Sequence, residues 1–362
     1  MNSTNKIPFS IKAPLILLGI YAFVSMLFIA QSIIIPFIYA VLISIVLGPL
    51  VNFLVGKGIN RILAISITLL LTIFILVSLG LFVGSQATMF REALPKLIQK
   101  LYVLYDNLVK TLTNNYNINN DELTQYIEKV KAELSGNGSA IMGRTVNTVG
   151  NVVMVIFLLP VYIFMLLYYQ RHLISFIHRA FGTDNDEKVS EILSETKTIV
   201  KSYLMGMLLE AVIVATLYSI GLLLLGIPYA ILLGVMGAFL NLIPYLGSII
   251  AGGLSMVISL VTKEHPSYSL LVLGLYILIQ FIDNNYIIPK IVGSKVRINA
   301  LISMLAIIGV ASLWGIAGMF LAIPLTAILK LIFDKIKELK AWGFLIGDPD
   351  PIVPKKRLRI LK

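Results

Sequence analysis

The sequence of 362 residues has no cysteine, only three histidines and few charged side chains, 13% in all. The lack of cysteine excludes disulfides, thiolate metal sites and cysteine nucleophiles. The sequence also lacks a Gly-x-x-x-x-Gly-Lys-Ser/Thr phosphate loop, a Gly-x-Ser-x-Gly elbow and a His-Glu-x-x-His motif. We therefore predict that the chain is not an enzyme and that it holds neither a cofactor nor a metal ion.

Water cannot be the main solvent of this chain, because soluble domains contain about a quarter charged residues. Hydrophobic residues make up 58% of it, and several apolar runs reach the roughly 20 residues that cross a bilayer as a helix. The apolar runs cover 13–30, 33–55, 62–84, 147–169, 202–226, 228–262, 267–289 and 298–332. A helix satisfies its own backbone hydrogen bonds in lipid, so the sequence predicts an all-α polytopic membrane protein.

Two of the runs, 228–262 and 298–332, are too long for a single crossing. Each holds 35 residues, which as one helix would extend about 50 Å, against a hydrocarbon core of roughly 30 Å. We expect two broken or re-entrant helical hairpins in addition to about six transmembrane helices. The parity of the spans predicts that the first hairpin enters from outside and the second from inside.

The distribution of positive charge predicts the topology. Nine of the 29 basic residues behind the net charge of +11 lie between Lys330 and Lys362, and others lie in short loops. This pattern is typical of the cytoplasmic side of a membrane protein, and we do not expect a nucleic-acid partner. It places both termini and 170–201 in the cytoplasm and 85–144 outside. The first apolar run resembles a signal peptide, but a second run follows at once, which favours an uncleaved first span.

The polar region at about 85–145 predicts an extramembrane helical insertion. Leucines alternate there in steps of three and four, as in the seam of a coiled coil, at Leu94, Leu97, Leu101, Leu104 and Leu108. The seam fits either a helix lying on its own protein or on the membrane surface, or a contact with another subunit. A second amphipathic helix is expected over 123–134, after a turn rich in asparagine.

Proline and glycine interrupt both hairpins at membrane depth. The first hairpin breaks after Asn241. The interrupting residues of the two hairpins are Pro244, Gly247, Gly315, Gly318 and Pro324. Backbone groups freed at such breaks are tolerated only where protein or a watery cavity surrounds them, and paired broken segments of opposite entry point to the binding site of a transporter. The alternative is two ordinary hairpins joined by Pro/Gly turns.

Two carboxyl groups lie at membrane depth, Glu210 in the run 202–226 and Asp283 in the run 267–289. Gln280 and Asn284 stand at helical spacing from Asp283, so the three are expected to share one face. An unpaired carboxylate in hydrocarbon costs several kcal/mol, and Asp283 must therefore be paired, hydrated or protonated. It fits either a site that exchanges a proton or cation, or a structural anchor that pairs with the basic residues following it.

Small residues recur at every fourth position of the first hairpin, at Gly247, Ala251, Ser255 and Ser259. The third run contains a similar Gly80-x-x-x-Gly84 pattern. Such ridges let a second helix approach closely, so we expect helix packing at both.

Four motifs carry a family resemblance: Leu-Gly-Ile-Pro-Tyr-Ala at 225–230, Asn-Leu-Ile-Pro-Tyr-Leu-Gly at 241–247, Gln-x-x-Asp-Asn at 280–284 followed by Pro-Lys-Ile-Val-Gly, and the run 315–325. In these motifs and in its hydropathy the chain resembles the autoinducer-2 exporter family of prokaryotic membrane proteins. The resemblance implies an oligomeric exporter of small polar molecules, with exchange of sodium or other cations for protons in some members. The residues that match the family motifs are Asn241, Pro244, Gly247, Gln280, Asp283, Asn284, Pro289, Gly293, Gly315, Gly318 and Pro324.

These observations lead to one hypothesis about function. We expect a secondary transporter in a prokaryotic cell membrane that exports a small polar solute, autoinducer-2 or another metabolite, coupled to an ion gradient. A cation/proton antiporter and a membrane scaffold without transport are the alternatives. The expected partners are the solute or a cation and proton, the lipid bilayer, and further copies of the chain. The expected binding residues are Asp283, Asn284, Gln280, Glu210 and Asn241, and the expected hinge residues lie at the breaks and at Pro289 and Gly293.

Four regions are expected along the chain. Transmembrane helices occupy 1–84, and the extramembrane insertion occupies 85–145. A transmembrane transport core follows over 146–335. A basic cytoplasmic tail ends the chain over 336–362.

Overall fold

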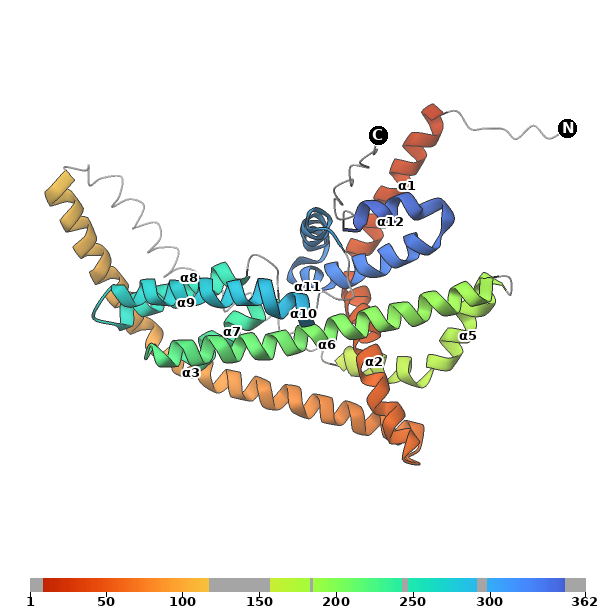
Figure 1. The fold of residues 1–362 in the computed structure, drawn as a ribbon, viewed down its shortest axis with the longest axis horizontal. Coiled ribbons are helices and arrows are strands. Elements are labelled where there is room, and N and C mark those ends of the chain that lie inside the picture. The colour runs from red at the N-terminus through yellow and green to blue at the C-terminus, as the bar shows by residue number, and fades with distance from the viewer. Residues whose placement is uncertain (1–8, 117–156, 183–184, 243–246, 292–297, 349–362) are drawn as a thin grey trace, which may run out of the picture.

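The computed structural model describes residues 9–116, 157–182, 185–242, 247–291 and 298–348, and these ranges are helical with short connections and no strand (Figure 1). Six described helices have the length and apolar composition to cross a membrane, and one bent helix pair raises this number to seven. The prediction of an all-α polytopic protein is confirmed.

The N-terminal helices are α1 (Phe9–Ile29), α2 (Gln31–Gly56) and α3 (Arg61–Tyr116). Helices α2 and α3 and the helix Phe157–Tyr168 share an apolar cluster. Its buried members include Ala40, Val51, Ile65 and Ile163. By contrast, the membrane-length stretch of α1 contains no buried residue, so α1 offers its apolar side chains to lipid or to another chain.

Two helices are much longer than a membrane is thick. Helix α3 has 56 residues and α6 (Asp186–Leu224) has 39, which correspond to about 84 and 58 Å. The second half of the polar region 170–201, which was predicted to be cytoplasmic, is continuous with the next span in α6. No proline or glycine lies between Asp186 and Met205, so nothing ends the helix where hydropathy changes.

The leucine seam predicted in the extramembrane insertion lies on α3. Leu97 is half-buried. The side chains of Leu94, Leu101, Leu104 and Leu108 lie outside the described part of the chain, as does the helix predicted over 123–134. The choice between surface contact and subunit contact therefore stays a prediction.

The fourth span bends sharply at its end. The helix Phe157–Tyr168 and α5 (Gln170–Phe181) meet at 67°. Arg61, at the start of α3, donates from Nη2 to the Leu167 carbonyl over 2.6 Å, which satisfies a backbone acceptor at the bend.

The first long apolar run folds as two short helices, α7 (Ala230–Asn241) and α8 (Gly247–Thr262). The 12 residues of α7 rise about 18 Å, less than the roughly 30 Å core. Helix α9 (Ser267–Ile282) follows, then a π-helix (Asp283–Ile287) and α10 (Ile288–Ile291). Helices α7 and α9 pack on the second half of α6, and α8 packs on α7 and α9, around buried Tyr218 and Tyr276.

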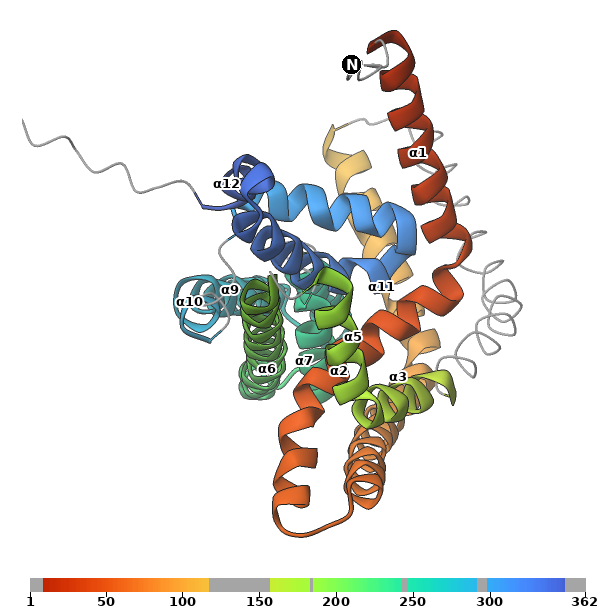
Figure 2. The ribbon, with the colours of Figure 1, turned by 90° about the vertical axis from the view of Figure 1, so that its right-hand side faces the viewer.

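The second long run is α11 (Ala300–Lys335), two helical arms joined at Gly315, which has φ 59° and ψ −144°. Figure 2 shows the two arms in blue. Only glycine adopts this backbone region readily. A Cβ atom on Gly318 would lie 2.4 Å from the Val310 carbonyl oxygen, so both glycines are needed for the bend. The Tyr39 hydroxyl donates to the carbonyl of Ala317 over 2.9 Å.

The two ends of α11 lie on the same side of the molecule. Asn299 accepts from the Ile302 amide as the N-cap, and its Nδ2 donates to the carbonyls of Leu345 and Gly347 beyond the other end. The short helices after α11 are a 3-10 turn (Lys337–Leu339) and α12 (Lys340–Ile346). Within α11 the chain thus reverses direction at Gly315, in the run for which a hairpin was expected.

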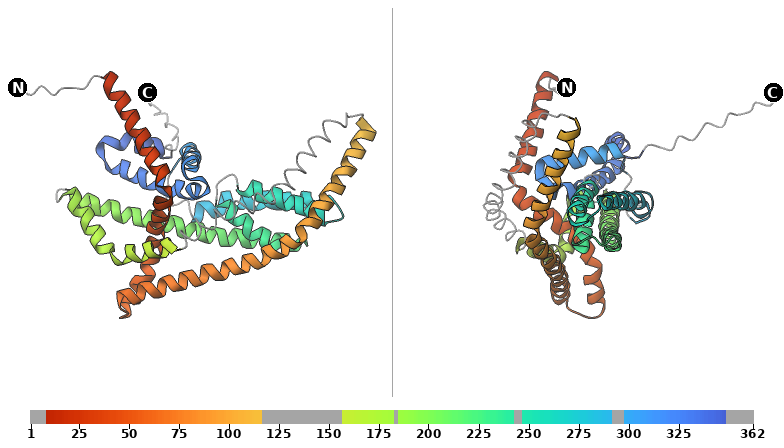
Figure 3. Two further views of the ribbon diagram at one scale, coloured as in Figure 1. Left: turned by 180° about the vertical axis from the view of Figure 1, so that it is seen from behind. Right: turned by 90° about the vertical axis from the view of Figure 1, so that its left-hand side faces the viewer.

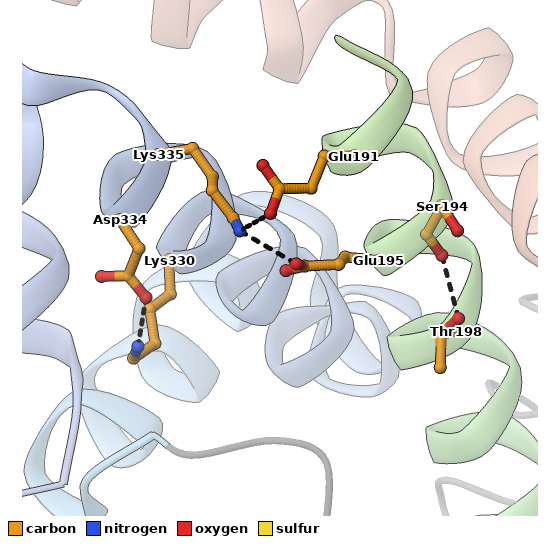
Figure 4. Close-up of polar contacts among 7 residues, drawn as sticks. All are labelled: Glu191, Ser194, Glu195, Thr198, Lys330, Asp334 and Lys335. Carbon is orange, nitrogen blue, oxygen red and sulfur yellow. Dashed lines mark hydrogen bonds and ion pairs between the residues drawn. The ribbon is translucent and has the colours of Figure 1, made fainter. Parts of the chain in front are cut away.

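Ion pairs gather where α11 ends. Lys335 Nζ contacts Glu191 at 2.7 Å and Glu195 at 2.9 Å on the first half of α6, and Lys330 pairs with Asp334 (Figure 4). The first half of α6 and the end of α11 therefore lie on the same side of the molecule, where charged side chains gather.

The helices form two groups along α6. In the first group, the second half of α6 packs with α7 and α9, and α8 packs on those two helices. In the second group, the first half of α6 meets α2 and α11 through Val200, Trp314 and Leu321. Figure 3 shows α3 running along the molecule toward the first group. Phe90 of α3 contacts Tyr229 there, with ring centroids 5.4 Å apart.

Candidate functional site

Three predicted site residues from three different helices meet inside the first group. Asn241 is the last residue of α7, Glu210 lies on α6, and Asp283 opens the π-helix. Asn241 Nδ2 donates to Asp283 Oδ2 over 2.8 Å and lies 3.5 Å from Glu210 Oε1. One amide nitrogen thus bridges two carboxyl groups that are 73 positions apart in the chain.

Both carboxyl groups are withdrawn from the surface. Asp283 is 0% exposed and Glu210 is 6% exposed. Asp283 Oδ1 has no hydrogen-bond partner among the described residues. Asp283 also forms no salt bridge within the described part of the chain. Lys290, one of the basic residues that follow it, is exposed. Two buried negative charges this close repel one another and are costly without a proton or a cation.

Gly247 holds α7 and α8 together beside this cluster. A Cβ atom at Gly247 would lie 1.7 Å from the Leu240 carbonyl oxygen and 2.4 Å from the Asn241 backbone nitrogen. No L side chain fits there without a backbone shift. The glycine therefore sets the position of Asn241.

The π-helix positions Asp283. Such wide turns are rare, and they occur frequently at functional sites. Pro289 lies just beyond the wide turn, in α10. Proline has no N–H group to donate to the preceding turn. Regular α-helical hydrogen bonding is therefore interrupted at Pro289, next to the wide turn.

Gln280 and Asn284 form their own pair. Gln280 Nε2 donates to Asn284 Oδ1 over 3.2 Å, as the four-residue spacing predicts. Asn284 is exposed, whereas Asp283 faces the interior. Gln280 Oε1 is buried and has no partner among the described residues.

The sequence interpretation missed a tyrosine pair beside the carboxyl groups. Tyr218 and Tyr276 stack with centroids 4.2 Å apart, and the Tyr276 hydroxyl shares a 2.8 Å hydrogen bond with Ser255. The Tyr218 hydroxyl is buried without a partner in the described ranges. Tyrosines in an apolar run look like packing residues, and the only sequence signal was the small-residue ridge that includes Ser255.

The ridge of small residues on α8 is confirmed. Gly247, Ala251, Ser255 and Ser259 are all buried.

The predicted hinge residues fall into three places. Gly315, Gly318 and Pro324 lie in α11, Pro289 follows the π-helix, and Pro244 and Gly293 lie outside the described residues.

The sequence of the chain is similar to the sequences of several known proteins. The chain is 28% identical to YueF of Bacillus subtilis over 269 residues, which is 71% of this chain and 70% of YueF. It is 32% identical to YrrI of the same organism over 40% of each chain. It is 24% identical to PerM of Escherichia coli over 48% of this chain and 49% of PerM. All three are named as candidate transport proteins or permeases.

The family profile described as AI-2E family transporter matches residues 15–338. This range includes most of α1, all the other membrane-length helices described above, and the cluster of Glu210, Asn241 and Asp283. The resemblance stated from the motifs is therefore confirmed, and the chain is a multi-pass membrane protein that belongs to the AI-2E family of transporters.

Proposed function

We propose that this chain is a secondary transporter that exports a small polar solute, with Glu210, Asn241 and Asp283 as its ion-coupling site. The observation that carries the proposal is the pair of buried carboxyl groups bridged by one amide. Buried ionisable groups inside a transmembrane bundle mark ion pathways and proton relays. No enzymatic role is proposed for any residue.

The position of the cluster fits a coupled mechanism. Asn241 ends a helix too short to cross the membrane, next to a hairpin break. Broken helices provide the sites of many secondary transporters, because their free ends can hold ions and polar solutes. If Asn241 moved with α7, the bridge between the two carboxyl groups would open, so solute passage and ion binding would be linked.

A cation/proton antiporter is the second candidate. The observation that favours it is the proximity of the carboxyl groups, because two carboxylates together can bind a cation and, when it leaves, a proton. In this case the coupling ions are the only substrates, and no organic solute is needed.

Everted membrane vesicles containing the protein and a luminal pH dye test both proposals. Autoinducer-2, a filtrate of small metabolites, and pulses of sodium or potassium chloride are added separately. A pH change on adding solute supports the exporter, and a change on adding a cation alone supports the antiporter. If none of these additions changes the luminal pH relative to protein-free vesicles, the chain is a scaffold and both proposals fail.

We propose that both termini face the cytoplasm. The support is the positive charge near Lys330–Lys362 and the contact of Lys335 with the first half of α6. Because the chain has no cysteine, single substitutions can be labelled cleanly. An impermeant thiol reagent added to intact cells should label Glu264→Cys, between α8 and α9, and should not label Lys337→Cys. The reverse pattern would overturn the orientation.

We also propose that the transporter is a homo-oligomer. The apolar side chains of α1 are exposed, and nothing described lies within 4 Å of a Cβ atom on Gly80 or Gly84. Exposed small-residue patterns of this kind form helix contacts in membranes. Native mass measurement in mild detergent should give a multiple of 40.0 kDa. A monomer in several mild detergents would count against this proposal.

A further inference from the structure

We propose that α5 lies in the headgroup layer of the membrane, with its apolar face toward the acyl chains and its basic face on anionic phospholipids. The helix has 12 residues and follows an apolar helix after a 67° bend. A turn of this size redirects the chain from a crossing direction toward the bilayer plane. Neither the transport function nor the family match assigns a role to α5.

The side chains of α5 divide into two faces. At 100° per residue, the apolar residues fall on one side of the helix, and they are Leu173, Ile174, Phe176, Ile177, Ala180 and Phe181. The other side carries Arg171, His172, Ser175, His178 and Arg179. A short helix with this separation is typical of proteins that lie at a membrane surface.

The apolar face is not covered by the protein. Phe176 is 64% exposed, Phe181 63% and Leu173 40%, although α5 contacts α6. No residue of α5 is buried. In a membrane protein, an uncovered apolar face beside a transmembrane helix is continuous with the surface that lipid already covers.

Neighbouring residues mark this level as the membrane–water interface. Tyr168 and Tyr169 lie at the bend, with ring centroids 4.9 Å apart, and both are exposed. Tyrosine is enriched where hydrocarbon meets the headgroups. Arg61 contacts Leu167 at the same bend, and Lys57 lies 4.6 Å from the Phe53 ring near the end of α2. The bend therefore combines aromatic and basic residues, as an interface does.

Charge decides which lipid the helix recognises. The only charged residues of α5 are its two arginines, it also carries two histidines, and it has no acidic residue. His178 is paired with Asp186 at the start of α6, which leaves Arg171, His172 and Arg179 on the polar face. Basic residues at this depth attract anionic headgroups, and phosphatidylglycerol supplies such a headgroup.

Nitroxide labels on two single-cysteine variants test the proposal. Leu173→Cys and Ser175→Cys are two positions apart, so they report opposite faces of the same helix. The labelled proteins are placed in vesicles of phosphatidylcholine with phosphatidylglycerol, and accessibility to oxygen and to a water-soluble nickel chelate is measured. The ratio of oxygen to nickel accessibility should be several-fold higher at position 173 than at position 175.

The contribution of charge is tested in the same vesicles and in vesicles of phosphatidylcholine alone. Phosphatidylglycerol should raise the ratio at position 173, and the double substitution Arg171→Gln and Arg179→Gln should abolish this rise. Nickel access at both positions would place α5 in water and overturn the proposal. Exclusion of both reagents at both positions would mean that protein covers α5, and would also overturn it. Equal ratios in the two vesicle types would refute the anionic headgroup.

Discussion

Asp283→Asn should reduce coupled transport to the level of vesicles without protein, while the protein remains folded in the membrane. Asparagine has nearly the same shape as aspartate and keeps an acceptor for Asn241 Nδ2, the donor of the 2.8 Å bond. It has no titratable state, so it cannot exchange a proton or balance a cation. Because a buried charge is removed, thermal stability in detergent should be unchanged or higher.

The matched control is Glu264→Gln, which neutralises an exposed carboxylate between α8 and α9. It should transport at the wild-type rate. Wild-type transport by Asp283→Asn with an unchanged pH dependence would make Asp283 a structural residue. If Glu210→Gln alone abolished coupling while Asp283→Asn did not, the coupling site would lie on α6.

Gly247→Ala should disrupt both folding and transport. Its Cβ atom would lie 1.7 Å from the Leu240 carbonyl oxygen and 2.0 Å from the carbonyl carbon, and backbone atoms cannot rotate away as a side chain can. Overpacking of this kind costs roughly 1–3 kcal/mol or more. The shift would also move Asn241. Transport should therefore decrease by more than the decrease in the amount of folded protein explains.

Gly253→Ala is the control, because it lies on the same helix, is exposed, and has nothing within 4 Å of its Cβ position. In a helix this change should be neutral or should stabilise by about 0.5–1 kcal/mol. Thermal unfolding in detergent and transport in vesicles are measured for both variants. Equal melting temperatures and equal rates for the two would show that α7 and α8 need no close contact.

The sequence identified the residues of the candidate site, but it did not predict how they are arranged. Glu210 and Asp283 are visible because carboxyl groups are rare in apolar runs, and Asn241 because it precedes a break. Their meeting at one amide depends on how α6, α7 and the π-helix pack, and no local pattern encodes that contact. The four-residue ridge on α8 was predictable because its spacing alone defines a helix face.

Helix ends were predictable only where a residue enforces them. Gly315 ends the first arm of α11 because its backbone conformation excludes other residues. Between the polar and apolar parts of α6, hydropathy changes without a breaking residue, so one helix continues through. The π-helix, which turns Asp283 inward and leaves Asn284 exposed, has no recognisable pattern in a single sequence.

Infrared difference spectroscopy of the protein in lipid tests the central claim most directly, because the carbonyl band of a protonated carboxylic acid reports proton binding at the buried pair. Spectra are recorded as the pH is lowered and as sodium is removed, for the wild type, Asp283→Asn, Glu210→Gln and the control Glu264→Gln. We predict a band from a water-shielded carboxylic acid in the wild type and in Glu264→Gln that is lost in Asp283→Asn and lost or shifted in Glu210→Gln. An identical band in all four proteins would contradict the assignment of Glu210, Asn241 and Asp283 as the coupling site.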